Sequence, residues 1–416
     1  MRFVHVTHRT WPVVGGSEQY VLRMARCQVR AGHEAIIIAT EAETLSALWS
    51  ARGKTLPADL PDRHEGVRIL RLPLRHLALG DVTFPLFRRL VWLLSRVSPQ
   101  AALPLGRYAP WLPDLAPVLA SAEADVLFAW NLTLEGLTIA VAREARRREI
   151  PWIAVPLLHL ARPRFYTMSH QLGLLRSATR VLAQTETERA YLLEQGIDRR
   201  RVSVVSPGVD PDAASRADGE RFRRKYGIPS GPLVVTISNL SFEKGAFHLV
   251  QAMRRIWQEG SPAALVLIGP PAPAIRRQLE KLPGEMQALC HRVGPVPEAD
   301  KWDALAAADV MALPSKTESF GIVFLEAWLA GTPVIGARSG AVAEVVREGV
   351  DGLLVEFGDV RGLAEAIRTL LNDRRLATAL GARGRDKVLQ TYTWDVQCAR
   401  LLESLSALGS PGQRLS

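Results

Sequence analysis

The chain has 416 residues, of which 48% are hydrophobic, and this predicts two globular domains and excludes a disordered or fibrous protein. Its net charge is +10; residues 1–210 hold 27 Lys and Arg against 19 Asp and Glu, and residues 211–416 hold 25 against 23. A basic first half indicates either an anionic partner or a solvated surface. Nucleic acid is excluded as the partner because the sequence has no zinc-finger spacing, basic region with heptads or aromatic RNA-binding signature.

The three cysteines, Cys27, Cys290 and Cys398, are far apart in the sequence and show no metal-ligand spacing. This pattern argues against a zinc site and against a disulfide framework, and it favours a reducing cytoplasm. The first residues predict a strand and not a signal peptide, because no apolar segment follows the first charge. We therefore expect a cytoplasmic protein.

Short apolar runs alternate with helix-period segments along the chain, which is typical of βαβ units and parallel sheets. A strand at residues 3–7 is followed by Gly15-Gly16 and by a helix at residues 17–31, which Gly32 ends. Further strands of the first half are predicted at residues 35–39, 67–70, 125–130, 152–155, 179–183 and 202–205.

Residues 84–113 depart from this alternation. They combine apolar and aromatic residues such as Phe84 and Trp92 with Arg88, Arg89 and Arg96. One interpretation is an amphipathic helix that contacts a membrane interface. The other is an ordinary buried helix with arginines at its rim, and the sequence slightly favours this second interpretation.

A turn at residues 206–210 closes the first half, and the alternating pattern then starts again. A helix is predicted at residues 245–258, and the strands are predicted at residues 233–238, 264–268, 309–313, 333–335 and 352–355. The sequence thus predicts an α/β protein of two doubly wound, Rossmann-like domains joined near residues 208–215. Because such sheets bind ligands at the carboxyl ends of their strands, two facing sheets would form an interdomain cleft.

The most informative segment, residues 314–327, leads from a strand through a loop into a helix at residues 322–330. The amides of Gly321, Ile322 and Val323 begin this helix, so together with the helix dipole they predict an anion site, most naturally for phosphate.

Glu318 precedes the helix, and Glu326 lies about one turn inside it with its side chain leaning back toward the N-terminus. The two glutamates could be solvated surface charges. Beside a phosphate, however, carboxylates are useful only as acceptors from hydroxyl groups. A phosphorylated sugar provides such hydroxyls, one set on ribose and one on a transferred hexose.

This segment, Glu-Ser-Phe-Gly-Ile-Val-Phe-Leu-Glu-Ala, resembles the signature of glycosyltransferase family 4, two glutamates separated by seven residues with Phe-Gly after the first. The resemblance covers nearly the whole chain. The other matching motifs are Gly15-Gly16-Ser17-Glu18, Ser206-Pro207-Gly208-Val209-Asp210, Glu243-Lys244-Gly245, Val293-Gly294-Pro295-Val296, Gly340 to Glu344, Gly349 to Val355 and the tail around Trp394.

The resemblance implies the GT-B fold and retention of the anomeric configuration. Residues 1–208 would form an acceptor-binding domain, residues 209–392 would form the nucleotide-sugar-binding domain, and a helix at residues 393–410 would cross back onto the first domain. The donor would be a UDP-sugar or a GDP-sugar carrying a hexose.

The resemblance also assigns roles to individual residues. Lys244 would hold the pyrophosphate, Glu318 would bind hydroxyls of the donor sugar, and Glu326 would bind the ribose diol. His159, which follows a predicted strand, would face the donor sugar, although it could instead be a packed core histidine. The remaining donor-binding residues implied are Gly15, Gly16, Ser319, Phe320, Gly321, Ile322 and Val323.

One position departs from the family, because Asn239 stands where an arginine usually provides a second cation for the pyrophosphate. A neutral hydrogen bond contributes less than a charge-assisted one. The donor site could therefore be weaker, or another arginine could compensate.

No Asp-any-Asp element stands at a strand end, so we expect a metal-independent reaction without a cofactor. A sugar phosphorylase, an epimerase and a catalytically weak nucleotide-sugar-binding protein are the alternatives, and a dehydrogenase ranks low because its glycine fingerprint is missing.

The basic first half and residues 84–113 favour an acceptor such as a glycolipid, which a peripheral protein would bind on the inner face of a membrane. Polysaccharide and small-molecule acceptors stay open. The sequence does not predict the oligomeric state.

Overall fold

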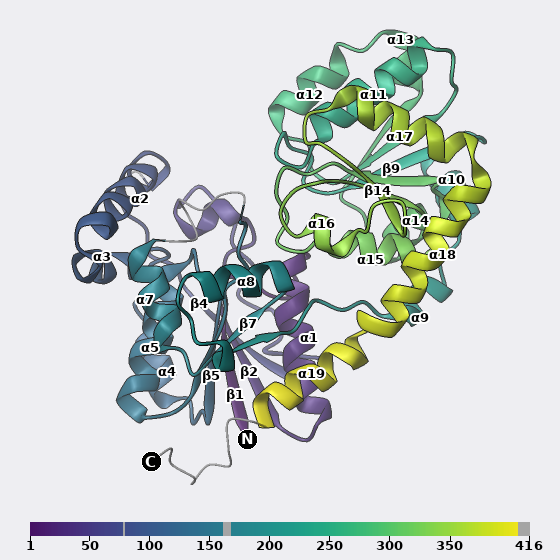
Figure 1. Ribbon diagram of the computed structural model, residues 1–416. Coiled ribbons are helices and arrows are strands. Elements are labelled where there is room, and N and C mark those ends of the chain that lie inside the picture. The colour runs from purple at the N-terminus through teal and green to yellow at the C-terminus, as the bar shows by residue number, and fades with distance from the viewer. Residues whose placement is uncertain (78–79, 161–167, 407–416) are drawn as a thin grey trace. The chain divides into compact units, whose positions relative to one another are not determined.

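The computed structural model describes residues 1–77, 80–160 and 168–406 (Figure 1). It consists of two compact units. Unit 1 is Met1–Ser206 together with the described residues from Cys398 onward, and unit 2 is Pro207–Gln397. Each unit contains a mostly parallel sheet with helices on both faces (Figure 1).

Unit 1 has an eight-stranded sheet in the order β3-β4-β2-β1-β5-β6-β7-β8, in which only the β3–β4 pair is antiparallel. The strands are β1 (Arg2–Val6), β2 (Glu34–Thr40), β3 (Arg63–His64), β4 (Val67–Leu72), β5 (Val126–Trp130), β6 (Trp152–Val155), β7 (Arg180–Ala183) and β8 (Val202–Val204). The helices are α1 (Gly16–Arg30), α2 (Gly80–Val97), α3 (Pro99–Gly106), α4 (Leu115–Ser121), α5 (Glu135–Arg148), α7 (Ser169–Ser177) and α8 (Glu186–Glu194), with short 3-10 turns at Leu45–Leu48 and Arg199–Arg201.

Unit 2 has a six-stranded parallel sheet in the order β11-β10-β9-β12-β13-β14. The strands are β9 (Leu233–Ile237), β10 (Ala264–Ile268), β11 (Cys290–Gly294), β12 (Val310–Leu313), β13 (Val334–Ala337) and β14 (Gly352–Val355). The helices are α9 (Pro211–Ser215), α10 (Gly219–Tyr226), α11 (Ala246–Gln258), α12 (Pro273–Glu280), α13 (Gly284–Ala288), α14 (Glu298–Ala307), α15 (Ile322–Leu329), α16 (Val342–Val345), α17 (Val360–Asn372), α18 (Arg374–Thr391) and α19 (Trp394–Ser406), whose last residues belong to unit 1.

The predicted strands are confirmed in both units, with ends that shift by at most two residues. They form where the sequence is continuously apolar, because a parallel strand covered by helices is buried on both faces. β5 and β10, for example, are buried along their whole length. The edge strand β11 was not predicted, because its residues are half-buried or exposed and form no apolar run.

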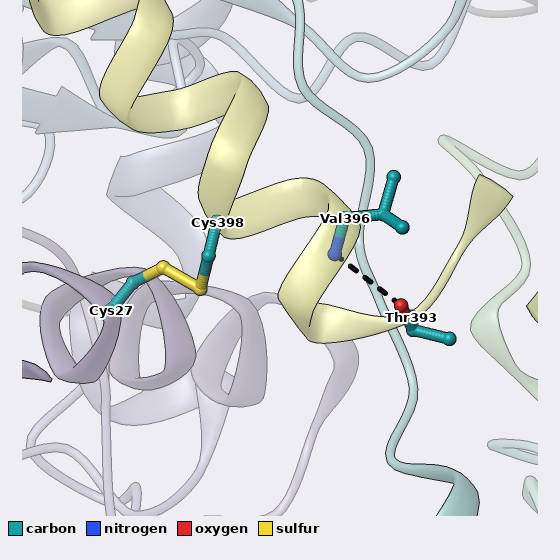
Figure 2. The surroundings of a disulfide bond; sticks show 4 residues. All are labelled: Cys27, Thr393, Val396 and Cys398. Carbon is teal, nitrogen blue, oxygen red and sulfur yellow. Dashed lines mark hydrogen bonds between the residues drawn. A yellow bond between two sulfur atoms is a disulfide. The ribbon is translucent and has the colours of Figure 1, made fainter. Parts of the chain in front are cut away.

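The expectation that the cysteines would not pair is wrong. Cys27 on α1 and Cys398 on α19 form a disulfide, with their Cα atoms 5.6 Å apart (Figure 2). Their sequence separation of 371 suggested separate locations, but α19 returns to unit 1, where Ser404 Oγ also lies 3.3 Å from Ser203 Oγ. Cys290, in unit 2, is free.

The buried-helix interpretation of residues 84–113 is also wrong. They form most of α2 and all of α3, which pack against each other outside the layer of α5 and α7 (Figure 1). Large apolar side chains of α2 are exposed, among them Leu86 at 62% and Val97 at 86%. Within the described residues, no helix is long and apolar enough to cross a membrane.

Candidate active site

In unit 2 the strand order reverses between the neighbouring strands β9 and β12. The loop after β9 leads into α11, and the loop after β12 leads into α15. Both helix N-termini therefore emerge at the carboxyl edge of the sheet, at the position where doubly wound folds bind ligands. The charged residues predicted from the sequence lie in these two loops and on α15.

Two glycines shape the loops. Gly245, directly before α11, has φ of 74°, and a Cβ there would lie 2.1 Å from the carbonyl oxygen of Pro314. Gly321, directly before α15, has φ of 90°, and a Cβ would lie 2.7 Å from the ring of Phe324. Glycine avoids both the left-handed strain and the collision. The two loops can therefore pack closely against each other.

Lys244 and Glu318 connect the loops, with Lys244 Nζ 2.6 Å from Glu318 Oε1. A backbone hydrogen bond of 2.8 Å from Lys316 N to Glu243 O joins the same segments. The Lys244 side chain is 26% exposed and that of Glu318 is 9% exposed. The ion pair is thus fixed by the fold, yet its lysine remains accessible to a ligand.

Helix α15 offers its N-terminus beside this pair. The amide of Phe324 donates to Gly321 O at 3.0 Å, so intrahelical bonding begins there, and Ile322 and Val323 precede it. Both residues are half-buried, and their amides with the positive end of the helix dipole favour an anion at this place. The structure therefore places a lysine and a helix N-terminus together, as an anion site requires.

Glu326, one turn into α15, is buried and pairs with Lys301 of α14, whose Nζ lies 2.6 Å from Glu326 Oε1 and 2.7 Å from Glu298 Oε1. Burial raises the pKa of Glu326, while the ammonium group of Lys301 opposes that rise. Burial alone would lower the pKa of Lys301, but the charges of Glu326 and Glu298 outweigh it and the pKa is raised. Lys301 thus helps keep Glu326 ionised.

The sequence did not single out Lys301 as a site residue. It lies on a different helix, 25 residues before Glu326, and the nearer Glu298 makes it look like an ordinary pair of one helix surface. Only the packing of α14 against α15 shows that it contacts the predicted ribose-binding carboxylate.

Two buried hydroxyl groups at the same edge lack a hydrogen-bond partner within the described residues, Ser238 Oγ after β9 and Ser315 Oγ after β12. Ser315 is completely buried. A buried polar atom without a partner costs free energy, about 1–3 kcal/mol for a donor or acceptor. These two hydroxyl groups therefore mark the carboxyl edge of the sheet as a place where polar groups are left unsatisfied.

The other predicted donor residues of unit 2 surround this centre in different ways. Phe320 is 2% exposed and packs against Tyr392 with ring centroids 5.5 Å apart, so only its backbone is available to a ligand. Ser319 is half-buried, whereas Asn239, two residues beyond the end of β9, is exposed.

In unit 1, Gly15 and Gly16 begin α1 after β1, at the edge where β1 and β5 reverse the strand order. A Cβ on Gly15 would lie 2.2 Å from Oε2 of Glu18. The Glu18 carboxylate is 2% exposed, with Arg9 Nη2 at 2.5 Å and His8 Nε2 at 3.5 Å from its Oε1. Burial alone would raise the pKa of Glu18, but His8 and Arg9 outweigh it and lower the pKa to about 2.

His159 lies four residues after β6 and is half-buried. The loop before it is held by Glu188, whose Oε1 accepts a 3.0 Å hydrogen bond from the amide of Leu158. His159 is thus at the carboxyl edge of the sheet of unit 1, whereas Lys244, Glu318 and Glu326 belong to unit 2.

Two family models match the chain, one for each unit. Residues 15–208 match the glycosyl transferase 4-like domain, and residues 218–387 match glycosyl transferases group 1.

Among curated proteins, one relative is a GDP-mannose-dependent alpha-(1-6)-phosphatidylinositol monomannoside mannosyltransferase of Mycolicibacterium smegmatis. The two sequences are 35% identical over 216 residues, and the matched region covers 49% of this chain and 55% of that protein. The chain is 33% identical over 253 residues to a D-inositol 3-phosphate glycosyltransferase of Nocardia farcinica, which covers 58% of this chain and 56% of the relative. The chain spans about half the length of these curated relatives.

Two solved structures show the same fold. Anabaena HepE in complex with UDP and glucose aligns with a TM-score of 0.72 at 20% identity, over 98% of this chain and 100% of that chain. Sucrose-phosphate synthase from Thermosynechococcus elongatus aligns with a TM-score of 0.73 at 21% identity, also over 98% and 100%. With both units matched, the chain belongs to the group 1 glycosyltransferases, the family 4 type, and has the GT-B fold.

Proposed function

We propose that the protein is a retaining, metal-independent glycosyltransferase that moves a hexose from a nucleoside diphosphate to a hydroxyl group of a lipid-linked acceptor. The observation that carries this proposal is the Lys244–Glu318 ion pair of 2.6 Å, which connects the loops after β9 and β12 beside the N-terminus of α15. It combines a cation for diphosphate with a carboxylate for sugar hydroxyls in one place.

In this proposal the donor separates the ion pair. Lys244 turns to the diphosphate, which also accepts hydrogen bonds from the amides of Ile322 and Val323. Glu318 then accepts hydrogen bonds from hydroxyls of the hexose, and Glu326 accepts from the ribose diol. Because each charge exchanges one partner for another, binding does not leave a buried charge unpaired.

The transfer itself forms one bond and breaks one. The acceptor oxygen bonds to the anomeric carbon on the face that the diphosphate leaves, the bond between that carbon and the phosphate oxygen breaks, and the acceptor proton passes to the leaving phosphate. Lys244 and the dipole of α15 stabilise the negative charge that develops there. This front-face route retains the anomeric configuration without a covalent intermediate, and its charge stabilisation needs no metal ion.

The relatives supply candidates for the substrates. The relative from Mycolicibacterium smegmatis is named for GDP-mannose and for a phosphatidylinositol monomannoside. The relative from Nocardia farcinica is named for D-inositol 3-phosphate. Both acceptors carry a phosphate on a polyol, which suits the basic first half of this chain. We therefore propose GDP-mannose or a UDP-hexose as the donor, and an acceptor at the inner face of a membrane. The role of His159, a contact with the donor sugar, rests on the family resemblance.

Product analysis tests the proposal. The purified protein is incubated with GDP-mannose or UDP-glucose and with phosphatidylinositol mannosides or inositol phosphate, in excess chelator. We expect a glycoside with the anomeric configuration of the donor. An inverted product refutes retention, and activity abolished by chelator but restored by manganese or magnesium refutes metal independence. Dependence on inorganic phosphate indicates a phosphorylase, a changed sugar without acceptor indicates an epimerase, and donor binding without turnover indicates a binding protein.

A further inference from the structure

Helix α2 of unit 1 places a row of large apolar side chains on the outside. Five of the eleven large hydrophobic residues that are exposed in the described chain lie on this helix. They are Val82 (65% exposed), Leu86 (62%), Leu90 (49%), Leu93 (48%) and Val97 (86%). With about 100° per residue, these positions fall within about 80° of the helix circumference and form one continuous stripe.

The opposite side of α2 is partly polar and faces the protein. Arg88 donates to Glu135 of α5, with Nη1 2.5 Å from Oε2, and its side chain is only 11% exposed. Ser95 Oγ lies 2.9 Å from Nδ1 of His170, and Gln171 Nε2 donates to the other oxygen of Glu135 at 2.6 Å. Burial alone would raise the pKa of Glu135, but Arg88 and His170 outweigh it and lower the pKa.

These contacts fix the rotation of the helix. Turning the leucines inward would remove Arg88 from the completely buried Glu135 and leave a buried carboxylate without its strongest partner, which is strongly destabilising. Val91 and the half-buried Phe87 and Leu94 pack on Ala102 and Met168 and hold the same orientation. The stripe is therefore kept on the surface by the structure around it.

The charges beside the stripe indicate what covers it. Arg89 and Arg96 are exposed and lie next to the leucines on the helix surface, and residues 82–97 contain no acidic residue. The guanidinium of Arg96 lies 5.2 Å from the ring of the half-buried Trp92. An apolar stripe flanked by arginines and an aromatic residue is suited to the boundary of a bilayer, where acyl chains meet anionic headgroups.

We propose that the outward face of α2, formed by Val82, Leu86, Arg89, Leu90, Leu93, Arg96 and Val97, docks on an anionic membrane surface. The leucines and valines enter the outer acyl region, and the two arginines contact phosphate groups of the lipids. This inference deepens the proposed function and rests on it for its purpose, since docking would bring unit 1 to an acceptor carried by lipid. The helix lies on the bilayer and does not cross it.

A second copy of the chain fits this face less well. In a twofold dimer the same patch contacts itself, so the arginines of both copies would be brought together without an acidic residue on the stripe to neutralise them. Anionic headgroups remove that repulsion. The experiment below includes the dimer as one of its outcomes.

Co-sedimentation with vesicles tests the docking, in the absence of nucleotide sugar and acceptor. Vesicles of phosphatidylcholine with and without phosphatidylglycerol are used at about 0.05 M and about 0.5 M salt, below and above the ionic strength at which surface charges are largely screened. The variants are Leu86→Gln/Leu90→Gln and Arg89→Gln/Arg96→Gln. Leu389→Gln, a 42% exposed leucine on α18 of unit 2, is the matched control. Circular dichroism verifies that each variant is folded.

We expect the wild type and the control to bind the anionic vesicles. The leucine variant should bind about tenfold more weakly or worse, because two large apolar side chains no longer leave water. Each arginine should contribute about fivefold at low salt and little at high salt.

Three outcomes overturn the inference: no binding by the wild type at low salt, equal binding by wild type and leucine variant, or a wild-type dimer in ultracentrifugation that the leucine variant abolishes. A protein that docks but transfers no sugar refutes the proposed function alone. One that transfers sugar but does not dock refutes this inference alone.

Discussion

The two units carry buried carboxylates at corresponding places, beyond the strands where each sheet reverses its order, but the carboxylates are held differently. In unit 2, Glu318 is paired with a lysine from another loop, and that lysine is 26% exposed. In unit 1, Glu18 is 2% exposed and is enclosed by Arg9 and His8 from the segment just before it. An accessible pair can exchange its partner for a ligand, whereas an enclosed one mainly stabilises its loop. The first arrangement is therefore the one suited to ligand binding, whereas the second stabilises its loop.

The largest effect should follow from breaking the accessible pair. Lys244→Met and Glu318→Gln should each lower kcat/KM about a thousandfold, since each removes a group that stabilises the transition state. The melting temperature should fall less in Glu318→Gln, which leaves no buried charge, than in Lys244→Met, which leaves the 9% exposed carboxylate of Glu318 without its cation.

Steady-state kinetics and calorimetry measure both effects. The variant that carries both substitutions completes a double-mutant cycle. The losses should be far from additive, since both residues act on one donor. Wild-type kinetics in either single variant, or unfolding of both, would contradict the assignment of this pair to the donor site.

The disulfide concerns unit 1 and should have the next largest effect. Cys398→Ser removes the bond between α1 and α19 and should destabilise the oxidised protein by about 3 kcal/mol, within the range typical of native disulfides. Urea unfolding with and without reductant measures this loss. Cys290→Ser, which changes the free cysteine of unit 2, is the control. If reductant destabilises the wild type and Cys398→Ser equally, the bond does not contribute in solution.

The enclosed carboxylate of unit 1 should affect stability and its dependence on pH. Because the pKa of Glu18 is lowered from its ordinary value of 4.5 to about 2, its stabilisation is fully present above pH 4.5 and is lost as pH falls toward 2. Glu18→Gln should therefore cost about 3 kcal/mol at neutral pH, and the difference from wild type should shrink below pH 4.5.

Unfolding free energies measured from about pH 7 down to about pH 3 test this behaviour, because they include the range below pH 4.5 in which the difference should shrink. Glu194→Gln, an exposed position on α8, is the control and should cost nothing measurable. A constant difference between Glu18→Gln and wild type over the whole range would show that the lost contact is not electrostatic.

The fold, and the residues that form the centre of the candidate donor site, could be predicted from sequence because their signals are local. Apolar runs locate the strands, and the eight-residue spacing from Glu318 to Glu326 places two carboxylates around one helix N-terminus. The structure adds what depends on packing between distant segments. Lys301 contacts Glu326 only because α14 packs on α15, and Cys27 meets Cys398 only because α19 returns to unit 1.

The orientation of α2 likewise depends on a contact between distant segments, which the sequence does not predict. Its sequence has apolar residues on several sides, so periodicity alone does not decide which side faces the protein. The decision depends on Glu135, 47 residues after Arg88, which draws that arginine inward. This long-range polar contact, together with the packing of Val91, selects which part of the apolar surface of α2 faces the protein.

Replacing Lys301 tests whether its ammonium group keeps Glu326 of unit 2 ionised. Lys301→Met leaves Glu326 buried without its cation, so the already raised pKa of Glu326 should rise further. A larger fraction of this carboxylate, which is proposed to bind ribose, would then be protonated at a given pH. Nucleotide affinity should fall about tenfold and recover as pH rises, because a carboxylate accepts hydrogen bonds from both ribose hydroxyls only when it is ionised.

Titration calorimetry with GDP and UDP between neutral and alkaline pH measures this effect. Lys281→Met, an exposed lysine that follows α12, is the control and should bind nucleotide like the wild type. An affinity loss that does not depend on pH would contradict the role given to Lys301 and indicate a loss of packing instead.

The smallest expected effect is a gain, at the position where unit 2 departs from its family. Asn239 is exposed beyond β9 and is uncharged. Asn239→Arg should strengthen GDP or UDP binding about fivefold, because a charge-assisted hydrogen bond to diphosphate replaces a neutral one. The gain should shrink at high salt, whereas Asn372→Arg, an exposed position at the end of α17, should give none. If Asn239→Arg leaves affinity unchanged, another cation of unit 2 already holds the diphosphate, and Lys316, exposed in the loop after β12, is the first candidate to replace.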